Sequence, residues 1–282
     1  MPAIENKMES PHQQLLKFFI LTFLFSWLMW LPGVLLSYNL IEPGKTFITI
    51  TNVLKWVGGM GPSLAALYLT IRYEGNAGVK ALLKRLMNIR LGYWYIPTLL
   101  LLPVILVVAH LLNMLLRNAS FPQTGLLAEP WWIPVLFILF VIMQLAEELG
   151  WRGYALDRLQ QRWNALFSSI LLGSIWAVWH LPMFLTSGFG QHNNHLPFGQ
   201  FLLTLVFVSV LITWLQNNTK NSLVPAFIVH SCINLSGEVL PLIEKNKETQ
   251  GDYSAWTLSN TLLFFAAVIV TVFWGYKKLK RS

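Results

Sequence analysis

The sequence from Trp131 to Tyr154, WWIPVLFILFVIMQLAEELGWRGY, places charged side chains at the end of a long apolar run. The run itself has no charged residue, and it is followed directly by Glu147 and Glu148, and then by Arg152. A charge in the middle of a bilayer costs about 2.5–3.5 kcal/mol on insertion scales. Because charges at this depth need a partner or a use, we expect the functional site of this protein to be built around this stretch.

The composition of the whole chain is that of a membrane protein. Of its 282 residues, 55% are hydrophobic and 11% are charged, whereas a soluble domain has about 25% charged residues. The sequence therefore predicts an all-α, polytopic membrane bundle. The formal net charge of +8 comes from short basic loops and does not indicate binding to nucleic acid. The single cysteine, Cys232, excludes an intrachain disulfide and a cysteine-based metal site.

The apolar runs predict about eight transmembrane helices that form one membrane-embedded domain, residues 1–282. Lys and Arg cluster after the second, fourth and sixth runs and in the C-terminal tail, so both termini are predicted to be cytoplasmic. The predicted spans are residues 15–36, 47–71, 94–116, 131–149, 163–185, 198–216, 222–240 and 258–276.

The segments between these spans carry further expectations. Residues 72–93 are basic, and their pattern predicts an amphipathic helix on the inner leaflet. The residues after the fourth span, which include Arg152 and Asp157, are predicted to form a loop. The compact termini and the lack of a targeting peptide favour a bacterial inner membrane, which is the expected location.

Glu147 and Glu148 are predicted to have different roles. As neighbours they lie about 100° apart around a helix and point in different directions. Glu148 and Arg152 are four residues apart, so they can pair on one helix face. Glu147 is then the carboxylate left for chemistry, and a carboxylate in a poorly solvated cavity can serve as a general base near neutral pH.

Polar residues in two later spans complete the candidate site. His180 precedes Pro182, which removes a backbone donor and predicts a bend beside the histidine. His230 and Asn234 are spaced i, i+4 and therefore share one helix face. An amide next to an imidazole can orient the ring or donate to an oxyanion.

Together these groups can act in either of two ways. Glu147 can activate a water as general base, or a divalent metal can bind His180, His230 and Glu147 with a water in the open position. The ligand types suggest zinc, although the His-Glu-x-x-His pattern of soluble zincins is absent. The predicted catalytic core is residues 131–240.

Three motifs occur in order through this core. EELGWRGY matches Glu-Glu-x-x-x-Arg, and Trp176–His180 matches an aromatic-x-x-x-His motif in which Trp occupies a position usually held by Phe. His230–Asn234 matches His-x-x-x-Asn/Asp. With these motifs the chain resembles the CPBP family of intramembrane proteases, also called the Abi family, which is typified by the type II CAAX prenyl endopeptidase.

The resemblance implies an intramembrane endopeptidase that acts on a prenylated or otherwise membrane-bound peptide or protein entering from the lipid bilayer. With zinc as the expected cofactor, the enzyme would be a metalloprotease. It implies that Glu147 activates the hydrolytic water, and that His180 positions this water or ligates a metal. His230 and Asn234 are then expected to stabilise the oxyanion or to complete the metal site. The implied role of Glu148 and Arg152 is to hold Glu147 in place.

The residues alone leave other classes of membrane protein open. The same polar cluster can hold a non-enzymatic protein together, with a bacteriocin-immunity or scaffold role. Intramembrane Glu and His can also form a proton relay in a proton-coupled transporter of small solutes. Against a transporter, the two halves of the sequence have no matching pair of broken helices.

Overall fold

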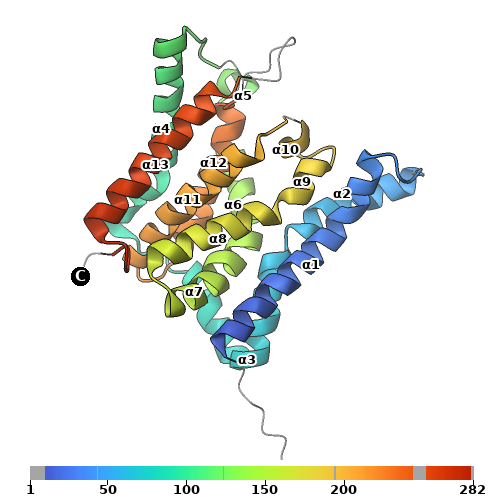
Figure 1. Cartoon of the computed structure of the whole chain (residues 1–282), viewed down its shortest axis with the longest axis vertical. Helices are drawn as coiled ribbons and strands as arrows, with labels where there is room; N and C mark the ends of the chain where they lie inside the picture. The colour runs from blue at the N-terminus through green and yellow to red at the C-terminus, as the bar shows by residue number, and fades with distance from the viewer. Residues whose placement is uncertain (1–9, 43, 123, 194, 244–251, 281–282) are drawn as a thin grey trace, which may run out of the picture.

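The computed structural model describes residues 10–280 except residues 43, 123, 194 and 244–251, and the elements in this part are helices (Figure 1). The elements are α1 (Pro11–Ser37), α2 (Lys45–Gly58), α3 (Gly61–Leu86), the short 3₁₀ helix η1 (Gly92–Trp94), α4 (Tyr95–Arg117), α5 (Gly125–Ala128), α6 (Trp132–Gly150), the π-helical segment η2 (Trp151–Ala155), α7 (Leu156–Arg162), α8 (Ala165–Trp179), α9 (Leu181–Leu185), α10 (Gly190–Asn193), α11 (Phe198–Asn218), α12 (Val224–Val239) and α13 (Ser254–Trp274).

Six helical stretches in the described residues are long and apolar enough to cross a membrane. The prediction of an all-α, multi-pass membrane bundle is therefore confirmed. The predicted seventh span corresponds to α12, which has 16 residues and is shorter than the roughly 17–25 residues that normally cross a bilayer. The count of eight spans and the cytoplasmic termini stay predictions. The six stretches are Pro11–Ser37, Gly92–Arg117, Trp132–Arg162, Ala165–Leu185, Phe198–Asn218 and Ser254–Trp274.

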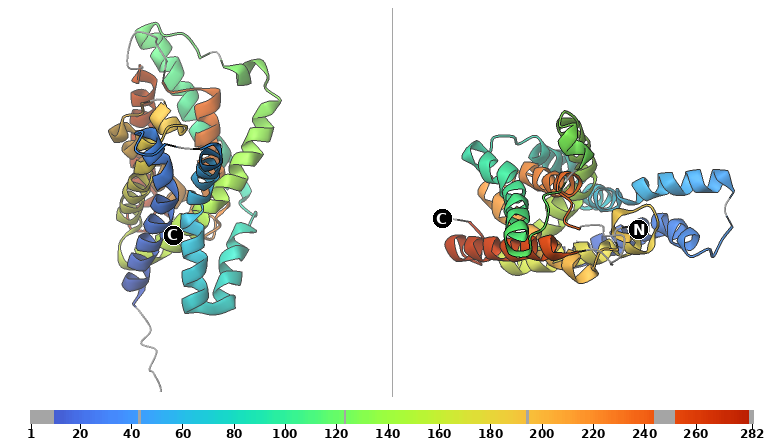
Figure 2. Two further views of the ribbon diagram at one scale, coloured as in Figure 1. Left: turned by 90° about the vertical axis from the view of Figure 1, so that its right-hand side faces the viewer. Right: turned by 90° about the horizontal axis from the view of Figure 1, so that it is seen from above.

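The centre of the bundle is formed by α6, α8, α11 and α12. Helix α11 packs on α8 and α12, and α6 packs on α12 and α3. Helices α4 and α13 cover one side of this centre, whereas α1, α2 and α3 cover the other (Figures 1 and 2). The outer helices expose apolar side chains such as Leu24, Val104 and Val272, as expected for surfaces that face lipid tails. The polar residues of the candidate site lie on the central helices.

The predicted second span is not one helix, because two glycines and a proline interrupt it. Helix α2 ends at Gly58, and α3 begins at Gly61 with Pro62 in its first turn. Proline suits this position because the first helical N–H groups have no intrahelical partner. Further along, α3 changes direction at Gly75, whose φ of 65° lies in the region that favours glycine.

The predicted loop after the fourth span is wrong, because this segment stays helical. Helix α6 continues through η2 into α7 without leaving the bundle. The charges of Arg152 and Asp157 suggested an exit from the membrane, but both side chains find partners of opposite charge inside the protein. The neutralised charges allow the helix to continue to Arg162.

Candidate active site

A close crossing of α6 and α3 fixes the position of the two adjacent glutamates. Gly150 follows them directly, and a Cβ at this position would lie 2.4 Å from the carbonyl group of Pro62. Only glycine allows this approach without a shift of backbone. The end of α6, with Glu147 and Glu148, is therefore held against the first turn of α3.

The segment η2 turns Arg152 back towards the end of α6. A π-helical turn widens the helix, and such turns are frequent at functional sites. The guanidinium of Arg152 donates from Nη1 to Glu148 Oε1 at 2.8 Å, and both side chains are fully buried. The pairing predicted from the i, i+4 spacing is therefore present. Its burial means that each charge depends on the other for compensation.

Glu148 also holds His230, which the sequence analysis did not foresee. Nδ1 of His230 lies 2.8 Å from Glu148 Oε1, the same oxygen that accepts from Arg152. The buried carboxylate thus links η2 to the middle of α12. The sequence analysis assigned the orientation of His230 to Asn234, but the group that holds the ring is Glu148.

Glu147 has a different environment from its neighbour. Its side chain is only half-buried, and its Oε2 accepts a hydrogen bond from the indole Nε1 of Trp176 at 3.0 Å. Among the described residues, no group donates to the other carboxylate oxygen. Trp176 lies on α8 and is fully buried. Glu147 therefore keeps one oxygen available at the surface of the buried cluster.

His180 lies at the break between α8 and α9, as Pro182 predicted. Its backbone angles, φ −76° and ψ −6°, lie in the region where many active-site residues are found. Nδ1 of the ring lies 2.8 Å from the carbonyl oxygen of Trp176, and the ring packs edge-on against Phe201. The break thus turns the imidazole back along α8 towards Trp176.

The hydrogen bonds assign the protons of both imidazoles. A carbonyl oxygen can only accept, so His180 carries a proton on Nδ1, and in the neutral ring Nε2 is an acceptor. His230 donates from Nδ1 to an ionised carboxylate in the same way. Neither Nε2 has a hydrogen-bond partner among the described residues. Both rings therefore offer this nitrogen to a water or a substrate.

Asn234 completes the cluster on α12, one helical turn beyond His230. Its side chain is half-buried and has no hydrogen-bond partner in the described part of the chain. Tryptophan 176 connects the other members, with ring centroids 4.8 Å from His230 and 5.9 Å from His180. Four of the predicted residues, Glu147, Arg152, His180 and His230, are thus in contact with Trp176.

The metal site proposed from Glu147, His180 and His230 is not preformed. Within the described residues, no group of three or more His, Cys, Asp or Glu side chains is arranged to hold a metal ion. One oxygen of Glu147 and Nδ1 of each histidine are engaged by protein groups, so the atoms left to face an ion are the other Glu147 oxygen and the two Nε2 nitrogens. Zinc binding stays a prediction.

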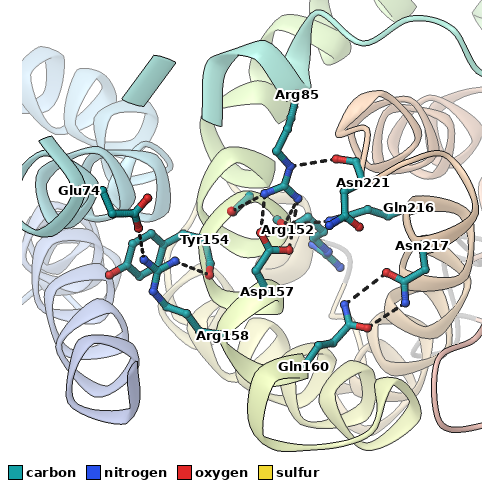
Figure 3. A network of polar contacts seen from close by, with 11 residues as sticks. Glu74, Arg85, Arg152, Tyr154, Asp157, Arg158, Gln160, Gln216, Asn217 and Asn221 are labelled. Carbon is teal, nitrogen blue, oxygen red and sulfur yellow. Dashed lines mark hydrogen bonds and ion pairs between the residues drawn. The ribbon is translucent and has the colours of Figure 1, made fainter. Parts of the chain in front are cut away.

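A second polar network contacts η2 and the start of α7 (Figure 3). Arg85 of α3 pairs with Asp157 at 2.5 Å and donates to the carbonyl oxygens of Gly153 and Asn221 at 3.0 and 2.9 Å. Arg85, which lies in the segment predicted to form an inner-leaflet helix, therefore turns its side chain towards η2. The position of this segment on the inner leaflet stays a prediction.

Gln216 and Arg158 extend this network. The fully buried Gln216 of α11 donates to the carbonyl oxygen of Arg152 at 3.1 Å. Arg158 lies over the ring of Tyr154, with 3.4 Å between the guanidinium carbon and the ring centroid, and it pairs with Glu74 at 2.6 Å. Sequence reasoning missed these residues, although a glutamine at the end of an apolar span was a usable signal.

Comparison with known proteins agrees with this constellation. A family described as "Type II CAAX prenyl endopeptidase Rce1-like" matches residues 129–236, which include all six candidate site residues. The curated protein "CAAX prenyl protease 2" of Methanococcus maripaludis is 30% identical over 239 residues, which are 82% of this chain and 86% of that protein. The chain belongs to the Rce1-like CAAX prenyl endopeptidase family. The resemblance noted from the three motifs is confirmed.

Membership of the Rce1-like family decides between the classes that the residues alone left open. The family supports an intramembrane endopeptidase, and therefore a hydrolase in a multi-pass membrane protein. The non-enzymatic and transporter alternatives have no comparable support. The family does not assign the roles of individual residues in this chain, which rest on the geometry above.

Proposed function

We propose that this chain hydrolyses a peptide bond in a lipidated, membrane-associated substrate by means of a water activated by Glu147. The observation that carries the proposal is the contrast between the two adjacent carboxylates. Glu148 is fully buried and accepts from Arg152 and His230. Glu147 is half-buried, is held through one oxygen by Trp176, and keeps its other oxygen for a water.

In the first step, Glu147 acts as general base. A water bound to its Oε1 loses a proton to the carboxylate as the water oxygen attacks the substrate carbonyl carbon. Nε2 of His180 accepts a hydrogen bond from the second O–H of this water. This bond orients the lone pair of the water oxygen towards the substrate carbonyl carbon. His180 suits this role because its Nδ1 proton is committed to a backbone carbonyl.

In the resulting tetrahedral intermediate, the former carbonyl oxygen carries the negative charge. Asn234 donates to this oxyanion from Nδ2. His230, held through Nδ1 by Glu148, is the second group that we place against the oxyanion. Donors held in position before the reaction stabilise such a charge most effectively, and the bond between His230 and Glu148 provides this preorganisation.

The intermediate collapses when the carbonyl double bond reforms and the C–N bond breaks. The electron pair of that bond goes to the leaving nitrogen, which takes the proton that Glu147 received from water. The products are a carboxylic acid on one fragment and an amine on the other. Glu147 returns to its ionised form, so one residue serves as base and then as acid.

The proposed substrate class is a peptide or protein carrying a prenyl or other lipid group. Its support is the relative named "CAAX prenyl protease 2" and the position of the cluster within a helical bundle with apolar outer faces. A lipid anchor in the bilayer brings the peptide to the bundle without passage through water. The bacterial inner membrane stays the predicted location.

Zinc remains a prediction separate from this mechanism. Glu147 and the Nε2 atoms of His180 and His230 are the groups that would approach an ion. Since the described residues do not form a three-ligand cluster, each step above uses groups of the chain and one water. Metal analysis of the purified protein tests the zinc prediction.

The test uses the purified full-length protein in nanodiscs, with a fluorogenic peptide ending in a farnesylated CAAX sequence and the same peptide without the lipid. We expect cleavage of the lipidated peptide and a loss of at least about 100-fold in kcat for Glu147→Gln. Glu238→Gln is the matched control, because Glu238 is exposed and lies one turn beyond Asn234. Equal activity of Glu147→Gln and wild type would overturn the proposal.

A further inference from the structure

Trp176 contacts nearly every group of the candidate active site. Its indole N–H donates to Glu147, its ring lies against Arg152 and His230, and its carbonyl oxygen accepts from His180. These contacts combine one side chain and one backbone group. Trp176 is thus in contact with four of the six candidate site residues.

We propose that Trp176 is a positioning residue that orients the general base Glu147 through its indole N–H. The inference rests on the proposed function and deepens it. Trp176 does not exchange a proton with substrate in this account. Its effect on the reaction passes through the carboxylate that it holds.

Two neighbours restrain the indole ring, which makes its N–H direction well defined. The guanidinium carbon of Arg152 lies 4.2 Å from the ring centroid, a cation–π arrangement. His230 meets the same ring at a centroid distance of 4.8 Å in a T-shaped contact. The ring is completely buried, so it has no room to rotate without displacing these neighbours.

The hydrogen bond to Glu147 fixes the plane of the carboxylate. With Oε2 held 3.0 Å from the indole nitrogen, the direction of Oε1 follows from the geometry of the group. A carboxylate without this bond could rotate about its last side-chain torsion, which has a broad energy profile. Loss of the N–H should therefore reduce the fraction of Glu147 that is ready to take a proton from water.

The donor is a property of tryptophan at this position. The aromatic-x-x-x-His motif usually has Phe here, and phenylalanine keeps an aromatic face for Arg152 but has no N–H. Trp176→Phe thus removes the donor while retaining much of the packing. In this chain the orientation of the base depends on a bond that a phenylalanine would not supply.

Trp179 provides a matched control on the same helix. It is also fully buried and it contacts the His180 ring at a centroid distance of 4.8 Å. Its indole nitrogen has no hydrogen-bond partner in the described residues. Trp179→Phe therefore changes ring size and burial as Trp176→Phe does, but it removes no hydrogen bond to a carboxylate.

The experiment measures kcat, KM and thermal unfolding of both variants in nanodiscs with the farnesylated peptide. We expect Trp176→Phe to lower kcat by about 10- to 100-fold, as for loss of a hydrogen bond to a charged group, with KM unchanged within about twofold. Trp179→Phe should retain kcat within about twofold. A wild-type kcat for Trp176→Phe, or an equal loss in both variants, would overturn the inference.

A second variant separates the N–H from the packing of the ring. Replacement of Trp176 by 3-benzothienylalanine, which has sulfur in place of the indole N–H in a ring of nearly the same shape, should give the same loss of kcat without lower thermal stability. Unchanged kcat in this variant would contradict the inference. Glu147→Gln is measured in parallel to distinguish this failure from a failure of the proposed function. If Glu147→Gln is active, Glu147 is not the general base and the proposed function fails. If Glu147→Gln is inactive but the Trp176 variants are active, only the role of Trp176 fails.

Discussion

The cluster around Glu147 and the network around Arg85 are both polar, and both contact the same π-helical segment, η2. In the Arg85 network the guanidinium nitrogens donate to Asp157 and to backbone carbonyl groups of three other residues (Figure 3). In the Glu147 cluster several atoms have no partner among the described residues. They include one oxygen of Glu147, Nε2 of both histidines and the Asn234 amide, and also the buried Oε2 of Glu148 and Nε and Nη2 of Arg152.

The difference teaches how to separate polar groups that hold a membrane protein together from those that perform chemistry. Buried polar groups need partners, and a satisfied network such as that of Arg85 joins α3 to η2 and to the turn before α12. Groups that bind a substrate must keep some of their hydrogen-bond donors or acceptors unpaired. Glu148 belongs to the supporting structure on a different ground, because it is fully buried and its Oε1 holds both Arg152 and His230, while its Oε2 has no partner among the described residues.

The largest expected effect in this comparison is that of Glu148→Gln. The substitution removes the charge that compensates Arg152 and leaves a buried guanidinium unpaired, which is expected to cost about 3–5 kcal/mol of stability. It also releases the carboxylate contact of His230, so we expect kcat to fall by about 10- to 100-fold, as for loss of a group that orients a histidine. Thermal unfolding and the cleavage assay measure the two effects.

A stable Glu148→Gln protein with lowered activity would place Glu148 with the chemistry rather than with the support. Glu147→Gln is the matched comparison, because it makes the same substitution one position away. We expect this neighbouring variant to unfold at the wild-type temperature.

A smaller effect is expected for Gly150→Ala, at the point where α6 crosses α3. The new Cβ would lie 2.4 Å from the Pro62 carbonyl group, and relief of this clash is expected to cost about 1–3 kcal/mol. Gly199→Ala is the control, since a Cβ at Gly199 has no neighbour within 4 Å. If both variants unfold at the same temperature, close crossing does not fix the glutamates.

The smallest effect is expected from removal of metal ions. Since the described residues form no three-ligand cluster, treatment of the purified protein with EDTA or 1,10-phenanthroline should leave kcat within about twofold. The zinc content of purified wild type, His180→Ala and His230→Ala, measured by elemental analysis, tests independently whether the histidines bind a metal ion. Activity that is lost on chelation and restored by zinc would show that Nε2 of the two histidines binds an ion.

Much of the fold could be predicted because it depends on local sequence. Apolar runs placed α1, α4, α11 and α13 close to their observed bounds, and proline marked the breaks at Pro62 and Pro182. The pairing of Glu148 with Arg152 also follows from spacing along one helix. Each of these features is determined by residues that are near one another in the chain.

The remaining features depend on contacts between distant residues. Glu148 and His230 are 82 positions apart, and Arg85 and Asp157 are 72 apart. No spacing rule predicts such contacts from one sequence. The expected loop at Arg152 was wrong for this reason, because its charge suggested solvent while its partners lie within the bundle. The indole bond to Glu147 likewise depends on how α8 packs against α6.

The central claim is that Glu147 performs chemistry whereas the Arg85 network provides support. The most direct test compares Glu147→Gln with Asp157→Asn for kcat per folded molecule and for thermal unfolding. We expect Glu147→Gln to lose at least about 100-fold in kcat and to keep its stability. Asp157→Asn should keep kcat within about threefold and lose about 1–3 kcal/mol of stability. Loss of both properties in both variants, or catalysis by Glu147→Gln, would contradict the account.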